Sequence, residues 1–201
     1  MNHSYIMNLI DTLKPEEKSY LHYKELKKDY ILFREDDYCD SIGILIEGQL
    51  SIVTDLIDGQ SIVYNNITPY GVFGNNLIFS SNPYYRGDII AVENSKVALI
   101  YRNDLINLLK NNEKFLLMYM EIQSNFGKQL NARIKMLSIN SMSERFLYLL
   151  HLNKGTIKYN SITGLARQLN MERETLSRLI SKMIKDNIIV KEDKTIRIIK
   201  Q

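Results

Sequence analysis

The sequence of 201 residues predicts an α+β fold, in which short antiparallel strands precede a long helix and a small helical domain that ends in a β-hairpin. A change in the spacing of the apolar residues predicts this order. The spacing is close to two over residues 30–101, as in half-buried strands, and becomes three to four over residues 115–137, as on one face of a helix. We therefore expect three parts, namely residues 1–110, 111–138 and 139–201.

The first part is expected to be a jelly-roll-like arrangement of antiparallel strands that follows two short helices. The helices are expected at residues 4–12 and 15–28, the second opened by Pro15, which favours a first helical turn. Turn residues such as Gly48 and Gly71 separate the strands, and many short strands at regular spacing indicate an antiparallel roll instead of a parallel sheet. The expected strands are residues 31–33, 42–46, 50–54, 61–64, 89–92 and 97–101.

The second part is expected to be one long amphipathic helix, whose apolar stripe extends roughly 35 Å at about 1.5 Å per residue. Such a stripe must be buried, either on its own domain or on a second copy of the chain. We favour the second copy, because the flanking domains are too small to cover both ends of the helix. The residues assigned to this dimer helix are Phe115, Tyr119, Ile122, Phe126, Leu130, Ile134 and Leu137.

The third part begins after a break at residues 138–141. Ser141 and Glu144 have the Ser-x-x-Glu spacing of a capping box, so a new helix is expected to begin at Met142. Gly155 suits the left-handed residue that ends such a helix. The break therefore marks a domain boundary.

The charge of the chain changes at the same place. Residues 1–138 hold 14 basic and 17 acidic side chains, whereas residues 139–201 hold 12 and 6. Net charges of −3 and +6 indicate a nucleic-acid-binding module on a slightly acidic body. A chance excess of lysine on a solvated surface would give the same numbers, so the pattern of the residues has to decide.

The basic segment contains the pattern of a helix-turn-helix followed by a hairpin. Ser161 is expected to cap a short helix, and Asn170 tolerates the left-handed turn that follows it. A second helix is expected over residues 172–185, with one apolar and one polar face. Short strands at residues 188–190 and 195–199 are expected to form a terminal wing. This geometry presents the second helix to the major groove of DNA.

The run Arg173-Glu174-Thr175-Leu176-Ser177-Arg178, followed by the terminal hairpin, resembles the signature of the Crp/Fnr transcription regulators. Residues 44–50 and 71–74 are similar to segments of that family's double-stranded β-roll sensor domain, and the long helix is similar to its dimerisation helix. The resemblance implies a homodimeric winged helix-turn-helix regulator that binds a palindromic site in double-stranded DNA. It implies RNA polymerase and an unidentified small-molecule effector as further partners, and leaves open whether the protein activates or represses.

The resemblance further implies that Arg173, Glu174, Ser177 and Arg178 read base edges. An arginine fork matches O6 and N7 of guanine, and a glutamate accepts from N4 of cytosine, so we expect a G·C pair in each half-site. The alternative is that Glu174 and Arg178 only form a solvent-exposed ion pair. Glu172 stands where the family usually has a serine or threonine to cap this helix, so we expect either weaker DNA binding or a carboxylate that points away from the phosphate. The candidate phosphate contacts are Lys158, Ser161, Thr175 and Lys182.

The sensor segment departs from the cyclic-AMP-binding members of the family. The resemblance places Asn75 where those members have a glutamate for the ribose hydroxyl, and asparagine lacks that carboxylate acceptor. Arg86 is shifted by one position from the phosphate-binding arginine and is followed by glycine instead of serine. We therefore do not expect cyclic AMP to bind. The candidate pocket for another effector consists of Gly74, Asn75, Arg86, Leu130 and Asn131, and the alternative is an effector-independent regulator whose β-roll is purely structural.

Other cofactors and an enzymatic function are not expected. The single cysteine, Cys39, excludes an iron–sulfur cluster and is expected to be an inert thiol instead of a redox site. Heme and a metal-dependent cupin enzyme are not expected, because His3, His22 and His151 lie outside the strand pattern. No catalytic motif or metal-ligand cluster is present in the sequence. Without a secretory signal or an apolar run near 20 residues, a cytoplasmic protein that does not contact membranes is expected.

Overall fold

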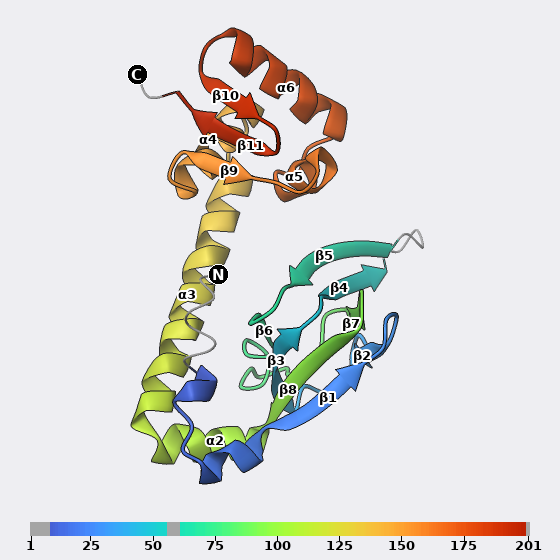
Figure 1. The fold of residues 1–201 in the computed structure, drawn as a ribbon, viewed down its shortest axis with the longest axis vertical. Helices are drawn as coiled ribbons and strands as arrows, with labels where there is room; N and C mark the ends of the chain where they lie inside the picture. The colour runs from blue at the N-terminus through green and yellow to red at the C-terminus, as the bar shows by residue number, and fades with distance from the viewer. Residues whose placement is uncertain (1–8, 56–60, 200–201) are drawn as a thin grey trace. The chain divides into compact units, whose positions relative to one another are not determined.

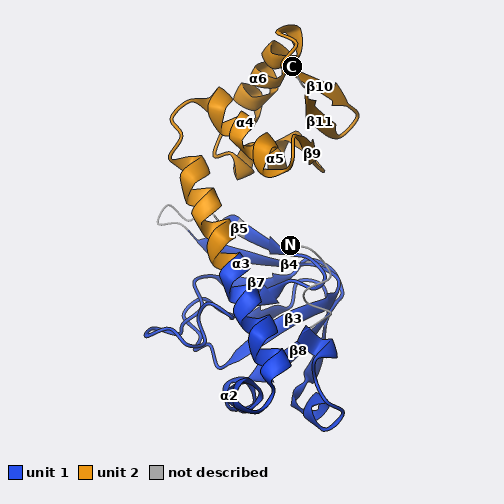
Figure 2. Cartoon of the chain, turned by 90° about the vertical axis from the view of Figure 1, so that its left-hand side faces the viewer, with its two compact units in different colours: residues 1–125 blue, residues 126–201 orange. Residues whose placement is uncertain are grey.

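A computed structural model of the protein describes residues 9–55 and 61–199. Contacts divide the chain into two compact units, residues 1–125 and 126–201 (Figure 2). The division falls inside α3 (Glu113–Leu137), the long helix that the apolar spacing predicts. It therefore lies within the segment 111–138, to which the sequence analysis assigns a part of its own.

The described residues of the first unit form two antiparallel sheets of four strands each (Figure 1). The strand order is β1-β8-β3-β6 in one sheet and β2-β7-β4-β5 in the other. The α+β class and the antiparallel roll are thus confirmed. The elements are η1 (Glu16–Tyr20), β1 (His22–Leu26), β2 (Ile31–Phe33), β3 (Ser41–Glu47), β4 (Leu50–Asp55), β5 (Ser61–Ile67), β6 (Val72–Phe73), β7 (Asp88–Ala91), β8 (Ser95–Tyr101) and α2 (Arg102–Asn111).

The core of this unit lies between the inner faces of the two sheets and the first half of α3. Ile44 of β3 and Leu50 of β4 are fully buried in it, and so is Phe115 of α3. Gly48 turns the chain from the first sheet into the second with φ +89°, and a Cβ atom there would lie 2.2 Å from Ser95 Oγ. Glycine is therefore required at this crossing for both its backbone angle and its small size.

One element of the first unit corrects the expectation from the sequence. Residues 15–28 do not form a helix: the chain makes only the short 3₁₀ turn η1 and then strand β1, which pairs antiparallel with β8 from His22↔Leu99 to Leu26↔Ser95. The free edge of β8 offers a row of backbone partners, and this pairing outweighs a weak local helix preference. His22 therefore lies in the β-roll, at its exposed surface. Of the helix expected at residues 4–12, residues 1–8 lie outside the described residues, and residues 9–11 are helical.

The second unit contains the end of α3 and a winged helix-turn-helix. The three strands form one antiparallel sheet in the order β10-β11-β9. Its core includes Met136 from α3, Phe146 from α4 and Leu176 from α6. The elements are α4 (Met142–Leu152), β9 (Thr156–Lys158), α5 (Ile162–Gln168), α6 (Arg173–Lys185), β10 (Ile189–Glu192) and β11 (Thr195–Ile198).

Local signals set the limits of these helices as the sequence predicts. Ser141 caps α4 by accepting from the Glu144 N–H at 3.3 Å, and Ser161 caps α5 by accepting from the Gly164 N–H at 3.0 Å. Asn170 has φ +50° in the turn before α6. Because each signal acts within a few residues of the helix end, the sequence was sufficient to find it.

Candidate nucleic-acid interface

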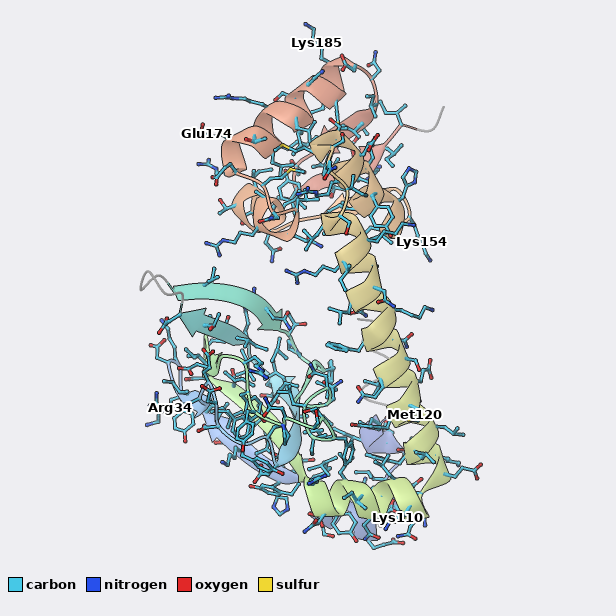
Figure 3. All side chains as sticks on the ribbon, turned by 180° about the vertical axis from the view of Figure 1, so that it is seen from behind. Arg34, Lys110, Met120, Lys154, Glu174 and Lys185 are labelled. Carbon is cyan, nitrogen blue, oxygen red and sulfur yellow. The ribbon has the colours of Figure 1, made fainter. Side chains whose placement is uncertain are left out.

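Helix α6, the second helix of the helix-turn-helix, separates its apolar and polar side chains cleanly. Leu176, Ile180 and Met183 are buried in the core of the second unit, whereas Ile184 is 40% exposed. The difference arises because Ile184 lies in the last turn of the helix, where the neighbouring elements no longer cover it. Figure 3 labels Glu174 and Lys185, which lie near the two ends of this helix.

The four residues expected to read bases lie together on the opposite face of α6. All are exposed, and they line a shallow open hollow of about 290 Å³. Arg178 Nη2 lies 3.7 Å from Glu174 Oε2, with 84% and 82% of the two side chains exposed. An ion pair this exposed is weak, so both groups stay available to a ligand. The four are Arg173, Glu174, Ser177 and Arg178.

The N-terminus of α6 is capped only by backbone geometry. Glu172 occupies the capping position with extended backbone angles, and its side chain makes no capping hydrogen bond. Its carbonyl still accepts from the Leu176 N–H at 3.0 Å, which begins the helix. The first N–H groups of the helix therefore remain open to solvent or to a bound anion.

The candidate phosphate contacts lie on three different elements. Lys158 ends β9 and Ser161 precedes α5, and both line a hollow of about 270 Å³. Lys182 is exposed on α6, whereas Thr175 on the same helix is half-buried. The Ser161 hydroxyl already accepts a hydrogen bond as a helix cap and retains its O–H to donate to a phosphate.

The stripe assigned to a dimer helix divides into two parts, which corrects the expectation of one continuous seam. Phe115, Tyr119 and Ile122 are buried in the core of their own unit, because the first half of α3 covers the β-roll. Leu130 and Ile134 are 49% and 56% exposed. Of the remaining two, Leu137 is also exposed and Phe126 is half-buried.

Two exposed apolar residues on α3 were missed by the sequence analysis. Leu117 and Met120 lie on the first half of the helix with 63% and 53% of their surface exposed, and Met120 is labelled in Figure 3. Met120, Gly127 and Ile134 repeat every seven residues, and Leu130 and Leu137 do so between them. A heptad search would have found Met120, because it continues the repeat of Leu130, Ile134 and Leu137, whereas Leu117 lies outside that repeat.

Comparison with known proteins gives one family match and several structural ones. The model of the family described as "Cyclic nucleotide-binding domain" matches residues 23–112, and a search of curated proteins gave no match. A CooA mutant from Carboxydothermus hydrogenoformans is similar in structure, with 14% identity, TM-score 0.72 and coverage of 96% of this chain and 90% of that one. The chain has the Crp/Fnr fold.

Two further structures carry the same fold. The c-di-GMP responsive global regulator CLP from Xanthomonas campestris is 16% identical, with TM-score 0.65 and coverage of 97% and 100% of the two chains. A transcriptional regulator of the Crp/Fnr family from Eubacterium rectale is 14% identical, with TM-score 0.55 and coverage of 97% and 94%. At these identities the likeness shows the fold alone, and the side chains of this chain must supply the argument for function.

In this Crp/Fnr fold, the segment expected to hold an effector is tied to α3 by its own side chains. Asn75 is 5% exposed, and its Nδ2 donates to Gln123 Oε1 at 2.6 Å. Gln123 Nε2 in turn donates to the Asn75 carbonyl at 2.7 Å, and the Tyr119 hydroxyl reaches the same carbonyl at 3.4 Å. Leu130 and Asn131, expected to complete the pocket, are exposed on α3 beyond the first unit. The residues of α3 that meet Asn75 are therefore Tyr119 and Gln123, and Gln123 was not among the residues predicted from the sequence.

The loop expected to supply a phosphate-binding arginine turns a tyrosine inward instead. Arg86 is exposed, whereas its neighbour Tyr85 is 2% exposed, and its ring stacks on Phe33 at 4.6 Å between centroids. Gly74 has φ +75°, and a Cβ atom there would lie 3.4 Å from the Tyr85 hydroxyl. Successive side chains of an extended segment point to opposite sides. A shift of one position therefore places the phenol of Tyr85 on the inner side, where the resemblance leads us to expect the guanidinium of an arginine.

The surroundings of Cys39 are those of an unreactive thiol. The side chain is fully buried, and its Sγ donates weakly to the carbonyls of Ser41 and Gly74 at 3.4 and 3.6 Å. Burial raises the pKa of this thiol, which keeps it protonated at neutral pH. Burial also raises the pKa of Tyr119 to about 12. Both groups are therefore neutral in the folded protein.

The described residues contain neither a cluster of three or more histidine, cysteine, aspartate and glutamate side chains that could hold a metal, nor a helix with the length and apolar character needed to cross a bilayer. The four side chains that the sequence predicts to read bases are exposed together on α6. The strongest candidate site in the described part of the chain is accordingly the exposed face of that helix.

Proposed function

We propose that this protein is a homodimeric transcription regulator that binds a palindromic site in double-stranded DNA. The observation that carries the proposal is the polar face of α6, where Arg173, Glu174, Ser177 and Arg178 are exposed together on a winged helix-turn-helix. Arginine and glutamate are the side chains that discriminate guanine and cytosine edges in the major groove. The net charge of +6 on residues 139–201 supports association with the phosphate backbone.

A second copy of the chain is the partner that the exposed stripe of α3 favours. Met120, Leu130, Ile134 and Leu137 occupy heptad positions, and the equivalent position at Gly127 opens to empty space. A seven-residue apolar repeat is the pattern by which two helices bury each other. We propose that two copies pair along this stripe and present two recognition helices, about one turn of DNA apart.

We refer to residues 74–86, the segment expected to hold an effector, as the cassette. Control by cyclic AMP is not proposed, because the cassette lacks a buried cation for the phosphate of this nucleotide. The buried polar and charged side chains among the described residues are Glu17, Ser41, Ser51, Asn75, Ser95 and Asn112, none of them basic. An anionic phosphate that enters such a site loses its hydration, and without a cationic partner nothing offsets the free-energy cost of that loss. We propose that any small-molecule effector is of a different chemical class.

A specific observation favours the alternative of an effector-independent regulator with a structural β-roll. Asn75 and Gln123 satisfy each other through two hydrogen bonds, so the cassette and α3 are joined without a ligand. Buried polar groups that are already paired offer no unsatisfied atom to a ligand. This alternative differs from effector control in one measurable respect, namely whether any metabolite changes DNA affinity or thermal stability.

Selection of bound fragments from genomic DNA by the purified protein tests the proposal, with and without small molecules from a cell extract. Enrichment of one palindromic sequence with a G·C pair in each half-site is the expected result. Recovery of fragments without a common sequence contradicts the proposed function. Thermal unfolding against a panel of nucleotides, heme and small metabolites separates the two forms of regulation, because a ligand that binds the folded state raises Tm.

A further inference from the structure

One arginine of the second unit connects the segment that follows α3, the start of α4 and the turn between α5 and α6. Arg145 lies in the first turns of α4, and its Nε and Nη2 donate to the Ile139 carbonyl at 3.1 and 2.7 Å. Its Nη1 donates to the Leu169 carbonyl at 2.9 Å and reaches the Asn170 carbonyl at 3.4 Å. One edge of the guanidinium thus holds the segment that follows α3, and the other holds the turn that precedes α6.

The end of α3 is fixed to the same body by two further contacts. Met136 is buried in the core of the second unit, and Lys135 Nζ lies 5.6 Å from the ring centroid of Tyr148 on α4. Residues 138–141 are therefore not a free hinge, even though they interrupt the helix. The last turn of α3, the start of α4 and the helix-turn-helix are joined at this point.

The turn that Arg145 holds determines where α6 begins. The Leu169 and Asn170 carbonyls follow the last turn of α5, where carbonyls have no partner inside the helix. A cation at the C-terminal end of a helix is also favourable with respect to the helix dipole. Asn170 has φ +50°, and α6 starts three residues later with Arg173. A change in this turn is therefore passed directly to the base-reading face.

We propose that Arg145 is a positioning residue, which fixes the orientation of the recognition helix relative to the end of the dimerisation helix. The inference rests on the proposed function, because the orientation matters only when two copies read one palindrome. In such a dimer, the angle between α3 and α6 sets the distance between the two recognition helices, and this distance must match the spacing of the half-sites. Arg145 then determines spacing specificity without contacting DNA.

The experiment measures the affinity of full-length protein for the selected palindrome and for the same half-sites with one base pair inserted or deleted. In Arg145→Gln, the affinity for the original spacing is expected to fall about tenfold. This is the loss expected if each of the two DNA-binding domains of a dimer is correctly oriented about a third of the time, because both must be correctly oriented for the dimer to bind. The ratio of original to altered spacing is expected to fall at least threefold. Affinity for unrelated DNA, which depends on phosphate contacts, is expected to stay within about twofold.

Two further variants distinguish positioning from charge and from stability. Arg145→Lys keeps the charge but lacks the rigid fork that reaches both carbonyls, so its spacing ratio is expected to fall as well. Lys128→Gln removes one positive charge from an exposed position on α3 and is expected to leave the ratio unchanged. A loss of stability lowers the active fraction equally for all sites and does not change the ratio.

An unchanged spacing ratio in Arg145→Gln, or full recovery of the ratio in Arg145→Lys, overturns the proposal. If Arg145→Gln does not fold, Arg145→Lys decides alone. Failure of the proposed function is a separate result, because it is seen when the unmodified protein selects no DNA sequence at all.

Discussion

Asn112 joins two helices and the N-terminal segment of the first unit, and its replacement by alanine tests how much this junction contributes to stability. Its backbone N–H donates to the Leu108 carbonyl at the end of α2, and its Oδ1 caps α3 by accepting from the Phe115 N–H at 3.0 Å. Its Nδ2 donates to Glu17 Oε2 at 2.7 Å and to the Thr12 carbonyl at 3.0 Å. Asn112→Ala removes the three side-chain bonds and leaves the backbone bond.

The magnitude follows mainly from two of the three groups that lose a partner, the Phe115 N–H and the Glu17 carboxylate. Loss of an N-cap costs about 1 kcal/mol. The Glu17 carboxylate is 7% exposed and keeps the Lys14 N–H as a partner, and loss of a hydrogen bond to a charged group costs about 1.5–3 kcal/mol more. We expect Asn112→Ala to lower the free energy of unfolding of the first unit by about 3 kcal/mol. For a domain of this size the decrease in Tm is roughly 10 °C.

Calorimetric and urea unfolding of the full chain at pH 7 measure this loss. Asn111→Ala is the matched control, because the Asn111 amide is exposed and bonds within its own helix. A double-mutant cycle with Glu17→Gln isolates the contact between the two side chains and is expected to give a coupling energy of about 1.5 kcal/mol or more. A loss below about 1 kcal/mol in Asn112→Ala, or a coupling energy within about 0.5 kcal/mol of zero, refutes the reasoning.

Four other variants test the site and the sensor. Arg178→Ala is expected to weaken specific binding by about 1–3 kcal/mol and to relax discrimination at one base pair in competition assays, and an equal loss for all sequences contradicts base reading. Ile134→Asp is expected to give monomers in sedimentation velocity, and a persistent dimer contradicts pairing along α3. Tyr85→Phe is expected to keep Tm within about 2 °C or raise it, because the buried Tyr85 hydroxyl interacts at most with the Cys39 thiol, a weak hydrogen-bonding group, and a large decrease contradicts this reasoning. The pKa of Cys39 is raised in the folded state, so its contribution to stability is present below the unfolded pKa near 9.0 and is lost as pH rises through the folded pKa. Cys39→Ala should therefore reduce the fall in the free energy of unfolding above pH 9. Identical pH profiles of the two proteins count against this prediction.

The helix-turn-helix could be predicted closely because its signals are local. Ser141, Ser161 and Asn170 each specify a helix end through atoms within three or four residues, and the structure confirms all three. The polar face of α6 follows from the period of one helix. Strand β1 was missed because its partner is β8, whose paired residues lie 69 to 77 positions further along the chain, and no local pattern records that pairing.

The apolar stripe of α3 shows a different limit of sequence reasoning. Periodicity places Phe115 and Ile134 on one broad face, but it does not say which body covers each end. The structure buries the first in the β-roll core and leaves the second exposed. Gln123 and Arg145 were missed for a related reason. Their partners, Asn75 and the carbonyls of Ile139 and Leu169, are reached only through the fold.

The cassette and the recognition helix differ in how their polar groups are satisfied, and the difference sets a chemical requirement for any effector. On α6 the polar side chains face solvent, so binding DNA displaces only water. In the cassette, a ligand must replace the two hydrogen bonds between Asn75 and Gln123, at 2.6 and 2.7 Å, each with a net value of about 1 kcal/mol. A molecule that offers a donor beside an acceptor, as an amide does, can bond both the N–H groups and the oxygens that the two side chains leave unpaired. A phosphate can accept from the N–H groups, but it has no donor for the oxygens and brings an uncompensated charge. Neutral ligands with adjacent donor and acceptor groups are therefore the first to test against this sensor.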